Sequence, residues 1–261
     1  YKTWWFIGLC FLFILASVFG VLEYQLYRSR QQKNELQRQV KARTAELERA
    51  MKKSDELLLN ILPEETAEEL KKFGKAKAKR HQPVTVLFTD FKGFTQIAEH
   101  LEPEELVAEI DYCFRNFDAI IDKYNIEKIK TIGDAYMCVG GIPTPDSDVP
   151  QKVVLAALEI RDFMKNLAEK RSHSGKDCFE IRIGVHTGGV IAGIVGTKKF
   201  QYDVWGDTVN VAARMEGNSE SGKVNISGAT YKLVKNYFKC EHRGKVTAKN
   251  KGEIDVYFVE R

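Results

Sequence analysis

The sequence predicts an α/β (α+β) fold, a ferredoxin-like βαββαβ sandwich that is preceded by a transmembrane helix and a coiled-coil stalk. Three observations predict it: an uncharged apolar segment at residues 4–22, a run without Pro or Gly from Tyr24 to Ile61, and alternating β-branched and amphipathic segments after residue 83. With 261 residues and 44% hydrophobic residues, the chain can form one globular core with an N-terminal extension.

The uncharged segment from Trp4 to Leu22 is long enough to be a membrane helix. At about 1.5 Å per residue it nearly crosses a hydrocarbon layer of ~30 Å. Aromatic residues lie at both ends of the segment, and basic residues follow it: Trp4, Trp5, Tyr24, Tyr27, Arg28, Arg30 and Lys33. Residues 1–23 are therefore predicted to span the membrane once, with the C-terminal side in the cytoplasm. The alternative is a signal peptide, but the segment has no basic n-region and no small-residue cleavage site.

Residues 24–62 are predicted to form a coiled-coil signalling stalk, because helix formers dominate and apolar residues recur at spacings of four and three. The seam consists of Leu36, Val40, Arg43, Leu47, Ala50, Ser54, Leu57 and Ile61. Arg43 and Ser54 interrupt it, so a solvated, partly amphipathic helix is the alternative. Pro63 should stop the helix. We expect a connector at residues 63–82 and the main globular domain at residues 83–261.

Strands and helices alternate in the remaining chain. The expected strands are residues 84–89, 126–132, 135–139, 179–185, 190–195 and 224–227, with two more near Cys240 and Val256. The expected helices are residues 103–124, 153–167 and 208–215, with a short one near Tyr231. Gly188 and Gly189 are expected to form a hairpin with close backbone packing. They do not match a phosphate-binding loop, since no Walker lysine or helix follows them.

Overall charge and cysteine content exclude several classes of protein. The net charge is only +4, and basic and acidic residues are mixed along the chain, so no nucleic-acid-binding surface is predicted. The five cysteines are scattered and include no C-x-x-C pair, which predicts neither a disulfide framework nor a zinc site.

Two aspartates lie at the ends of predicted strands. Asp90 follows the first strand, and Asp134 forms the tip of the next hairpin with Gly133. If the first and second strands are neighbours in the sheet, the two carboxylates meet, and such hard oxygen ligands suit Mg²⁺. Taken singly, each aspartate could equally be a turn former.

Three motifs occur in a fixed order along the chain. They are FTDFKGFT at 88–95, KIKTIGDAYM at 128–137 and YDVWGDTVNVAARM at 202–215. Together they resemble the catalytic domain of the class III adenylate/guanylate cyclase family over residues 82–260. The stalk and the segment LLNILP at 58–63 also resemble the signalling helix of membrane cyclases.

The resemblance implies roles for individual residues. Two ions of Mg²⁺ or Mn²⁺ per site would bind Asp90 and Asp134, with the backbone carbonyl near Phe91 helping. The purine-reading pair would be Lys130 and Asp203. The catalytic residues would be Asn210, which orients the ribose, and Arg214, which stabilises the transferring phosphate. Lys249 would bind the triphosphate, although the nearby Lys245 and Lys251 leave its register open, with a solvated turn as the alternative.

The identity of the purine-reading pair indicates the substrate. Adenine offers an acceptor at N1 and a donor at N6, which suit a lysine donor and an aspartate acceptor. Guanine instead has a donor at N1–H, which would need a carboxylate facing it in place of the lysine. The family further implies a head-to-tail homodimer with two shared sites, one subunit giving the metal aspartates. The sequence thus predicts a membrane-anchored adenylate cyclase that uses ATP. The alternatives are a guanylate cyclase and a weakly active nucleotide-binding dimerisation module.

Overall fold

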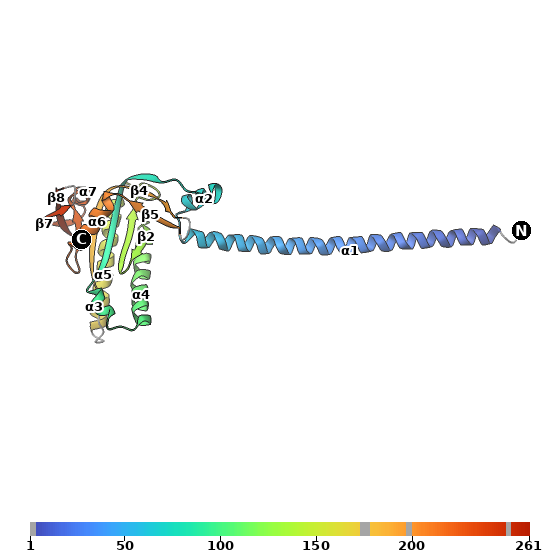
Figure 1. Cartoon of the computed structure of the whole chain (residues 1–261), viewed down its shortest axis with the longest axis horizontal. Helices are drawn as coiled ribbons and strands as arrows, with labels where there is room; N and C mark the ends of the chain where they lie inside the picture. Colours follow the sequence, from blue (N-terminus) through green and yellow to red (C-terminus); the bar gives the residue numbers. More distant parts are fainter. Residues whose placement is uncertain (1–3, 173–177, 197–199, 249–251) are drawn as a thin grey trace. The chain divides into compact units, whose positions relative to one another are not determined.

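The computed structural model describes residues 4–172, 178–196, 200–248 and 252–261 and divides into two units. Residues 1–60 form the first unit, whose only described element is helix α1 (Trp4–Leu59), and Ile61–Arg261 form the second. Helix α1 is drawn in blue in Figure 1. Residues 4–23 of the predicted membrane segment and most of the predicted stalk lie on this one uninterrupted helix.

Helix α1 has the length and hydropathy of a membrane-spanning helix near the N-terminus, and none of its residues is buried within the chain. Apolar side chains of the predicted seam are largely exposed as well, with 62% for Leu36, 60% for Leu47 and 57% for Leu57. A helix with such a row of exposed apolar side chains gains its stability when another apolar surface covers the row.

The predicted connector contains regular structure. Helix α2 (Glu64–Phe73) has acidic residues in its first turn and lysines in its last turn, and Gly74 ends it in the left-handed conformation with φ of 69°. Ala67 is 1% exposed. The high charge of this segment conceals its helical face in the sequence, because so few of its side chains are buried.

The second unit contains one mixed sheet of eight strands. They are β1 (Lys79–Lys92), β2 (Glu127–Ile132), β3 (Ala135–Gly140), β4 (Glu180–Val195), β5 (Gln201–Trp205), β6 (Val224–Ser227), β7 (Lys239–Ala248) and β8 (Gly252–Glu260). The order is β2-β3-β1-β4-β6-β8-β7, and β5 pairs with β4. The β2-β3-β1-β4 portion, with helices α4 (Pro103–Lys123) and α5 (Val149–Ser172), is the predicted ferredoxin-like βαββαβ sandwich.

The two faces of the sheet carry different helices. Ile181, Ile183 and Val185 of β4 belong to the core that also contains the buried side chains of α4 and α5. Because side chains alternate along a strand, Arg182 and Gly184 face the other side, where Gly184 approaches the backbone of helix α6 (Asp207–Gly217). Two short helices, α3 (Phe94–Ala98) and α7 (Gly228–Val234), complete the unit (Figure 1).

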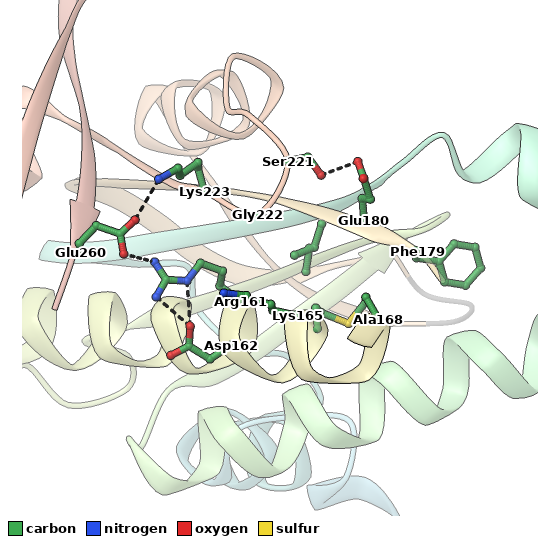
Figure 2. Close-up of a pocket in the computed structure, with 12 residues that line it drawn as sticks. Arg161, Asp162, Lys165, Ala168, Phe179, Glu180, Ser221, Gly222, Lys223 and Glu260 are labelled. Atoms are coloured by element: carbon green, nitrogen blue, oxygen red, sulfur yellow. Dashed lines mark hydrogen bonds and ion pairs between the residues drawn. The ribbon is translucent and has the colours of Figure 1, made fainter. Parts of the chain in front are cut away.

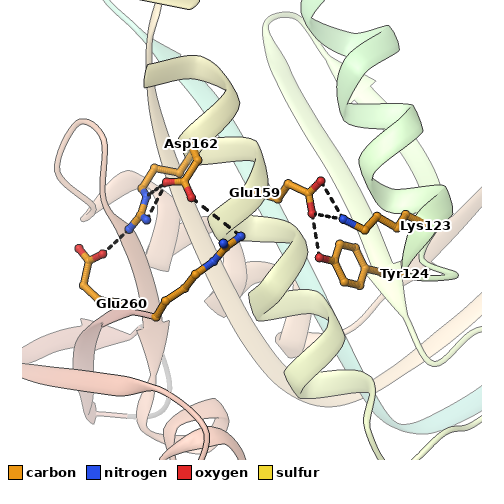
Figure 3. Close-up of polar contacts among 7 residues, drawn as sticks. Lys123, Tyr124, Glu159, Asp162 and Glu260 are labelled. Atoms are coloured by element: carbon orange, nitrogen blue, oxygen red, sulfur yellow. Dashed lines mark hydrogen bonds and ion pairs between the residues drawn. The ribbon is translucent and has the colours of Figure 1, made fainter. Parts of the chain in front are cut away.

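Hydrogen bonds and ion pairs join α5 to α4 and β8, as Figure 3 shows. Lys123 and Tyr124, at the end of α4, both donate hydrogen bonds of 2.8 Å to Oε2 of Glu159 on α5. On the same helix, Arg161 donates to Asp162 at 2.8 Å and to Glu260 of β8 at 2.5 Å. These contacts join α5 to the end of α4 and to β8 of the sheet.

Two expectations about the sheet are wrong. Strand β4 runs without a break through Gly188 and Gly189, so these glycines do not form a hairpin. They do permit close packing, since a Cβ at Gly188 would lie 2.5 Å from Oγ1 of Thr208. The first and second strands are not neighbours either, because β3 lies between β1 and β2.

Candidate active site

Asp90 and Phe91 lie within β1, which continues to Lys92 instead of ending at Thr89. The ring of Phe91 is 2% exposed and stacks on Phe179, with 4.8 Å between the ring centroids. This packing fixes the backbone at Phe91 and directs the neighbouring carboxylate of Asp90 to the opposite face of the sheet.

Asp134 lies in the turn between β2 and β3, where Gly133 has a φ of 62°. Thr89 pairs with Tyr136 in the β1–β3 register, so this turn lies beside the end of β1. Burial and the charge of Asp90 raise the pKa of Asp134, while a hydrogen bond from the Phe91 backbone N–H lowers it. The structure therefore brings Asp90 and Asp134 together, even though β1 and β2 are not neighbours.

Arg182 and Glu216 complete this cluster, and the sequence analysis did not identify either residue. Arg182 is the direct cross-strand partner of Asp90 in the β1–β4 register, and its NH2 donates to Oδ2 of Asp90 at 2.6 Å. Its Nε lies 3.0 Å from Oε1 of Glu216 on α6. The isolated charge of Arg182 within the apolar run of β4 is the sequence signal that could have revealed it.

The cluster contains more negative than positive groups. Arg182 contacts the carboxylates of Asp90 and Glu216, and the charge of the nearby Asp134 also acts on Glu216. Burial, together with the charge of Asp90, raises the pKa of Glu216 to about 7. Oε1 of Glu216 is buried without an aligned hydrogen bond, although Arg182 is close to it.

This donor set fits a divalent metal ion. Carboxylate oxygens are preferred ligands of Mg²⁺, which is commonly held by one or two carboxylates together with substrate phosphates. Among the described residues, no group of three or more His, Cys, Asp or Glu side chains has the geometry of a complete metal site. The paired aspartates thus match a metal that takes its other ligands from backbone and substrate.

Lys130 and Asp203 form a second group. Nζ of Lys130 donates to Oδ2 of Asp203 at 2.5 Å, and both side chains are mostly buried, with 25% and 13% exposed. Oδ1 of Asp203 accepts a hydrogen bond from the backbone N–H of Val204 at 2.8 Å. Asp203 lies on β5, a strand that the sequence analysis did not predict.

A β-bulge in β2 is what directs Lys130 toward β5. The register with β3 shifts between Lys128 and Lys130, so Lys128 pairs with Cys138 and Lys130 with Met137. Lys128 therefore reaches Asp118 on α4, whereas Lys130 faces the other side of the sheet. Regular alternation would have placed both lysines on one face.

Asn210 and Arg214 both lie on α6, four residues apart. Asn210 is exposed, and NH1 of Arg214 donates to the backbone carbonyl of Thr247 on β7 at 3.2 Å. Lys249 follows this strand but lies outside the described residues. Across the described part of the chain, no hydrogen bond or ion pair joins Lys130 or Asp203 to the aspartate cluster.

A separate groove of about 480 Å³ lies along α5, between this helix and the residues around Gly222 (Figure 2). Its charged side chains are mostly paired: Arg161 and Lys223 both bind Glu260, and Glu180 accepts a hydrogen bond from Ser221. This groove contains none of the residues that the motifs indicate, and two of its cations, Arg161 and Lys223, are paired with Glu260.

The chain is similar to known proteins in both sequence and structure. The family model for the adenylate and guanylate cyclase catalytic domain matches residues 76–261. An adenylate cyclase of Mycobacterium tuberculosis is 36% identical over 208 residues, which cover 79% of this chain and 46% of that protein. Atrial natriuretic peptide receptor 2 of Homo sapiens is 36% identical over 244 residues, covering 92% of this chain and 23% of the receptor.

Solved structures agree with the sequence matches. The guanylate cyclase domain from Catenaria anguillulae, in complex with GTP, aligns with a TM-score of 0.65 at 33% identity and covers 70% of this chain and 98% of that chain. The present chain spans less than half the length of the curated relatives described above. Its matched region and its mixed α/β sheet show that the chain belongs to the family of adenylate and guanylate cyclase catalytic domains.

Proposed function

We propose that this protein is an adenylate cyclase, which converts ATP into 3′,5′-cyclic AMP and pyrophosphate. The observation that carries the proposal is the pair formed by Lys130 and Asp203, in which a lysine donor and a carboxylate acceptor lie 2.5 Å apart. Adenine offers the complementary acceptor at N1 and donor at N6. Guanine would leave these groups badly paired, and an unpaired buried polar group is costly.

A guanylate cyclase is the second candidate, since the relatives include both an adenylate cyclase and a guanylate cyclase domain bound to GTP. The identity of the purine-reading pair, a lysine donor with an aspartate acceptor, favours ATP. A nucleotide-binding dimerisation module without turnover is disfavoured, because this chain carries an acidic pair, a purine pair and the α6 residues together.

In the proposed reaction the 3′-hydroxyl attacks the α-phosphate. Two ions of Mg²⁺ or Mn²⁺, held by Asp90, Asp134 and the backbone carbonyl of Phe91, would activate this hydroxyl and neutralise the leaving pyrophosphate. Asn210 orients the ribose, Arg214 stabilises the charge on the transferring phosphate, and Lys249 binds the triphosphate. The planar fork of Arg182, adjacent to Asp90, can contact two phosphate oxygens in the same way.

We further propose a head-to-tail homodimer with two equivalent sites. The purine pair and the aspartate cluster are separate in one chain, so a complete site would combine the aspartates of one subunit with Lys130, Asp203, Asn210 and Arg214 of the other. Mixing equal amounts of Asp90→Ala and Arg214→Ala proteins should restore about one quarter of the wild-type activity, because half the dimers regain one of two sites. No recovery in a verified mixed dimer would contradict shared sites.

Helix α1 is proposed to anchor the protein, with residues 1–23 in the membrane, residues 24–62 as a dimeric signalling stalk, residues 63–82 as a connector and residues 83–261 as a cytoplasmic catalytic domain. The length and hydropathy of α1 support the membrane segment. The 244-residue match to the natriuretic peptide receptor supports the stalk, because it extends beyond Ile61–Arg261 into α1. The chain should remain with membranes after an alkaline wash, and deletion of residues 1–23 should release it.

The decisive test of substrate choice is an assay of the purified protein with ATP or GTP and Mg²⁺ or Mn²⁺. Wild type should form cyclic AMP in preference to cyclic GMP. Lys130→Glu should lower kcat/KM for ATP by about 10- to 100-fold, the value of a hydrogen bond to a charged group. Lys128→Glu is the matched control, because this lysine lies two residues away on the same strand but faces α4.

The control should change kcat/KM for ATP by no more than about twofold, since its exposed ion pair contributes little. A preference for GTP in the wild-type protein would overturn the proposal of an adenylate cyclase. Equal losses in the two lysine variants would exclude Lys130 as the purine-reading residue.

A further inference from the structure

Arg182 is held between the candidate metal ligand Asp90 and a residue that no motif singled out. Its NH2 lies 2.6 Å from Oδ2 of Asp90, and its Nε lies 3.0 Å from Oε1 of Glu216. The guanidinium, with 27% of the side chain exposed, thus contacts one carboxylate from β1 and one from α6.

The two contacts differ in quality. The contact with Asp90 is a short, aligned, charge-assisted hydrogen bond. The contact with Glu216 is close, but Nε of Arg182 and Oε1 of Glu216 are both buried without an aligned hydrogen bond. A small rotation of the guanidinium toward Glu216 would improve the second contact and weaken the first.

The backbone holds Glu216 in place for this role. A Cβ added to Gly184 would lie 1.9 Å from the backbone nitrogen of Glu216, so only glycine lets α6 approach β4 this closely. The side-chain amide of Asn225 also donates to the carbonyl of Met215 at 2.8 Å. The glutamate is therefore fixed by the crossing of α6 over the sheet.

We propose that Arg182 is a built-in counter-cation that competes with the divalent ion for Asp90, and that Glu216 is the positioning residue that receives the guanidinium when the ion binds. The proposal rests on the metal site suggested above. It explains why the described cluster contains three carboxylates and one guanidinium: the site has room for added positive charge once Arg182 turns to Glu216.

Removal of a competing counter-cation should affect metal affinity differently from removal of an ordinary phosphate-binding arginine. Removing Arg182 should tighten metal binding in the absence of nucleotide, although it slows turnover, because the ion no longer displaces a cation from Asp90. A purely structural role would instead weaken both properties together.

The test is a titration of Mn²⁺ into the full chain in detergent without nucleotide, with free Mn²⁺ followed by electron paramagnetic resonance. Arg182→Met should lower the Kd for Mn²⁺ by about tenfold, since an adjacent opposite charge shifts a carboxylate equilibrium by at least this factor. Arg182→Lys keeps the cation and should stay near the wild-type Kd. Arg161→Met removes an arginine of the same double-bridged type from α5 and should leave the Kd unchanged.

Glu216→Gln should raise the Kd for Mn²⁺, both by loss of charge and by leaving the guanidinium on Asp90. The second contribution disappears in the double variant with Arg182→Met, so the effect of Glu216→Gln should be smaller in that background. An equal effect in both backgrounds would overturn the role of Glu216, and would do so even if Arg182 itself behaves as expected.

An unchanged or higher Kd in folded Arg182→Met protein would overturn the competition. If that variant does not fold, a Kd in Arg182→Lys well below the wild-type value would overturn it as well. Failure of the underlying metal site is a different result: binding of Mn²⁺ that persists in Asp90→Asn, or no binding by any variant, would refute the site and the inference with it.

Discussion

Two arginines on opposite sides of the sheet are each held between two carboxylates, yet their surroundings differ in charge. Arg161 on α5 donates to Asp162 and Glu260, and Arg182 on β4 contacts Asp90 and Glu216 (Figure 3 shows the first of these networks). The two guanidinium groups are similarly enclosed, with 13% and 27% of the side chain exposed.

The difference lies in the neighbours of the carboxylates. Near Arg161, Lys223 also binds Glu260 at 3.2 Å, and Arg261 lies 3.9 Å from Asp162, so the cations outnumber the anions. Burial acts to raise the pKa of Glu260, but the hydrogen bonds from Arg161 and Lys223 lower it.

Near Arg182 the balance is reversed. Burial and the charges of Asp90 and Asp134 raise the pKa of Glu216 to about 7, and Arg182 only partly offsets them. A network that is neutral or slightly positive, such as the one at Arg161, needs no additional cation to balance its charge. A network with surplus carboxylates is complete only when further cations arrive, which is the property expected of a metal and phosphate site.

The largest expected effect comes from replacing each arginine by methionine. Arg182→Met should lower cyclase turnover by about 100-fold or more, the usual loss when one charge-stabilising donor is removed from an active site. Arg161→Met should leave turnover within about twofold and instead reduce the free energy of unfolding by about 1–2 kcal/mol, because its carboxylates keep other cations. The measurements are cyclic AMP formation and urea unfolding of both proteins.

Equal losses of turnover in the two variants would remove the functional distinction between the networks. A loss of stability without a loss of turnover in Arg182→Met would show that both arginines are structural.

The next effect concerns the packing that holds Glu216. Gly184→Ala places a Cβ 1.9 Å from the Glu216 backbone nitrogen, so the end of α6 must shift, at a cost of about 3 kcal/mol in the free energy of unfolding. Gly217→Ala is the matched control, because nothing lies within 4 Å of its added Cβ, and its stability should stay within about 1 kcal/mol of wild type. Thermal unfolding of both variants checks this, and similar stabilities would mean that α6 does not need its close approach to β4.

Local patterns made much of this fold predictable. The alternation of strands and helices predicts the βαββαβ order, and the Gly133–Asp134 turn predicts the hairpin. Strand β5 was not predicted because it has only five residues and exposed ends, so Asp203 resembles a turn residue. Helix α2 was missed because charged residues dominate it.

The candidate site, like the fold, could be predicted from the sequence only in part. Reasoning about strand ends paired Asp90 with Asp134, although the two strands that it took as neighbours are separated by β3. The motifs indicated Lys130, Asn210 and Arg214 by family resemblance. The contacts of Arg182 could not be predicted, because they depend on the β1–β4 register and on where α6 crosses Gly184. The direction of Lys130 depends on a β-bulge, which the sequence does not mark.

The smallest expected effect is a dependence of stability on pH that the Arg182 network should show and the Arg161 network should not. The pKa of Glu216 is raised from 4.5 to about 7, so between these values the folded protein binds a proton that the unfolded chain releases. Stability should therefore fall as pH rises, by about 2 kcal/mol between pH 5 and pH 7 in the absence of divalent ions. Glu260, whose pKa is lowered, acts in the opposite direction and favours the folded state more as pH rises above its folded pKa.

Glu216→Gln cannot release this proton, so it should lose the decrease between pH 5 and pH 7, while Glu260→Gln should keep it. Melting temperatures measured in a chelating buffer at several pH values compare the three proteins. The same decrease in wild type and Glu216→Gln would place the buried proton elsewhere. A decrease that disappears only with Glu216→Gln would show that the surplus of carboxylates around Arg182, and not burial of an arginine network in general, sets the pH response.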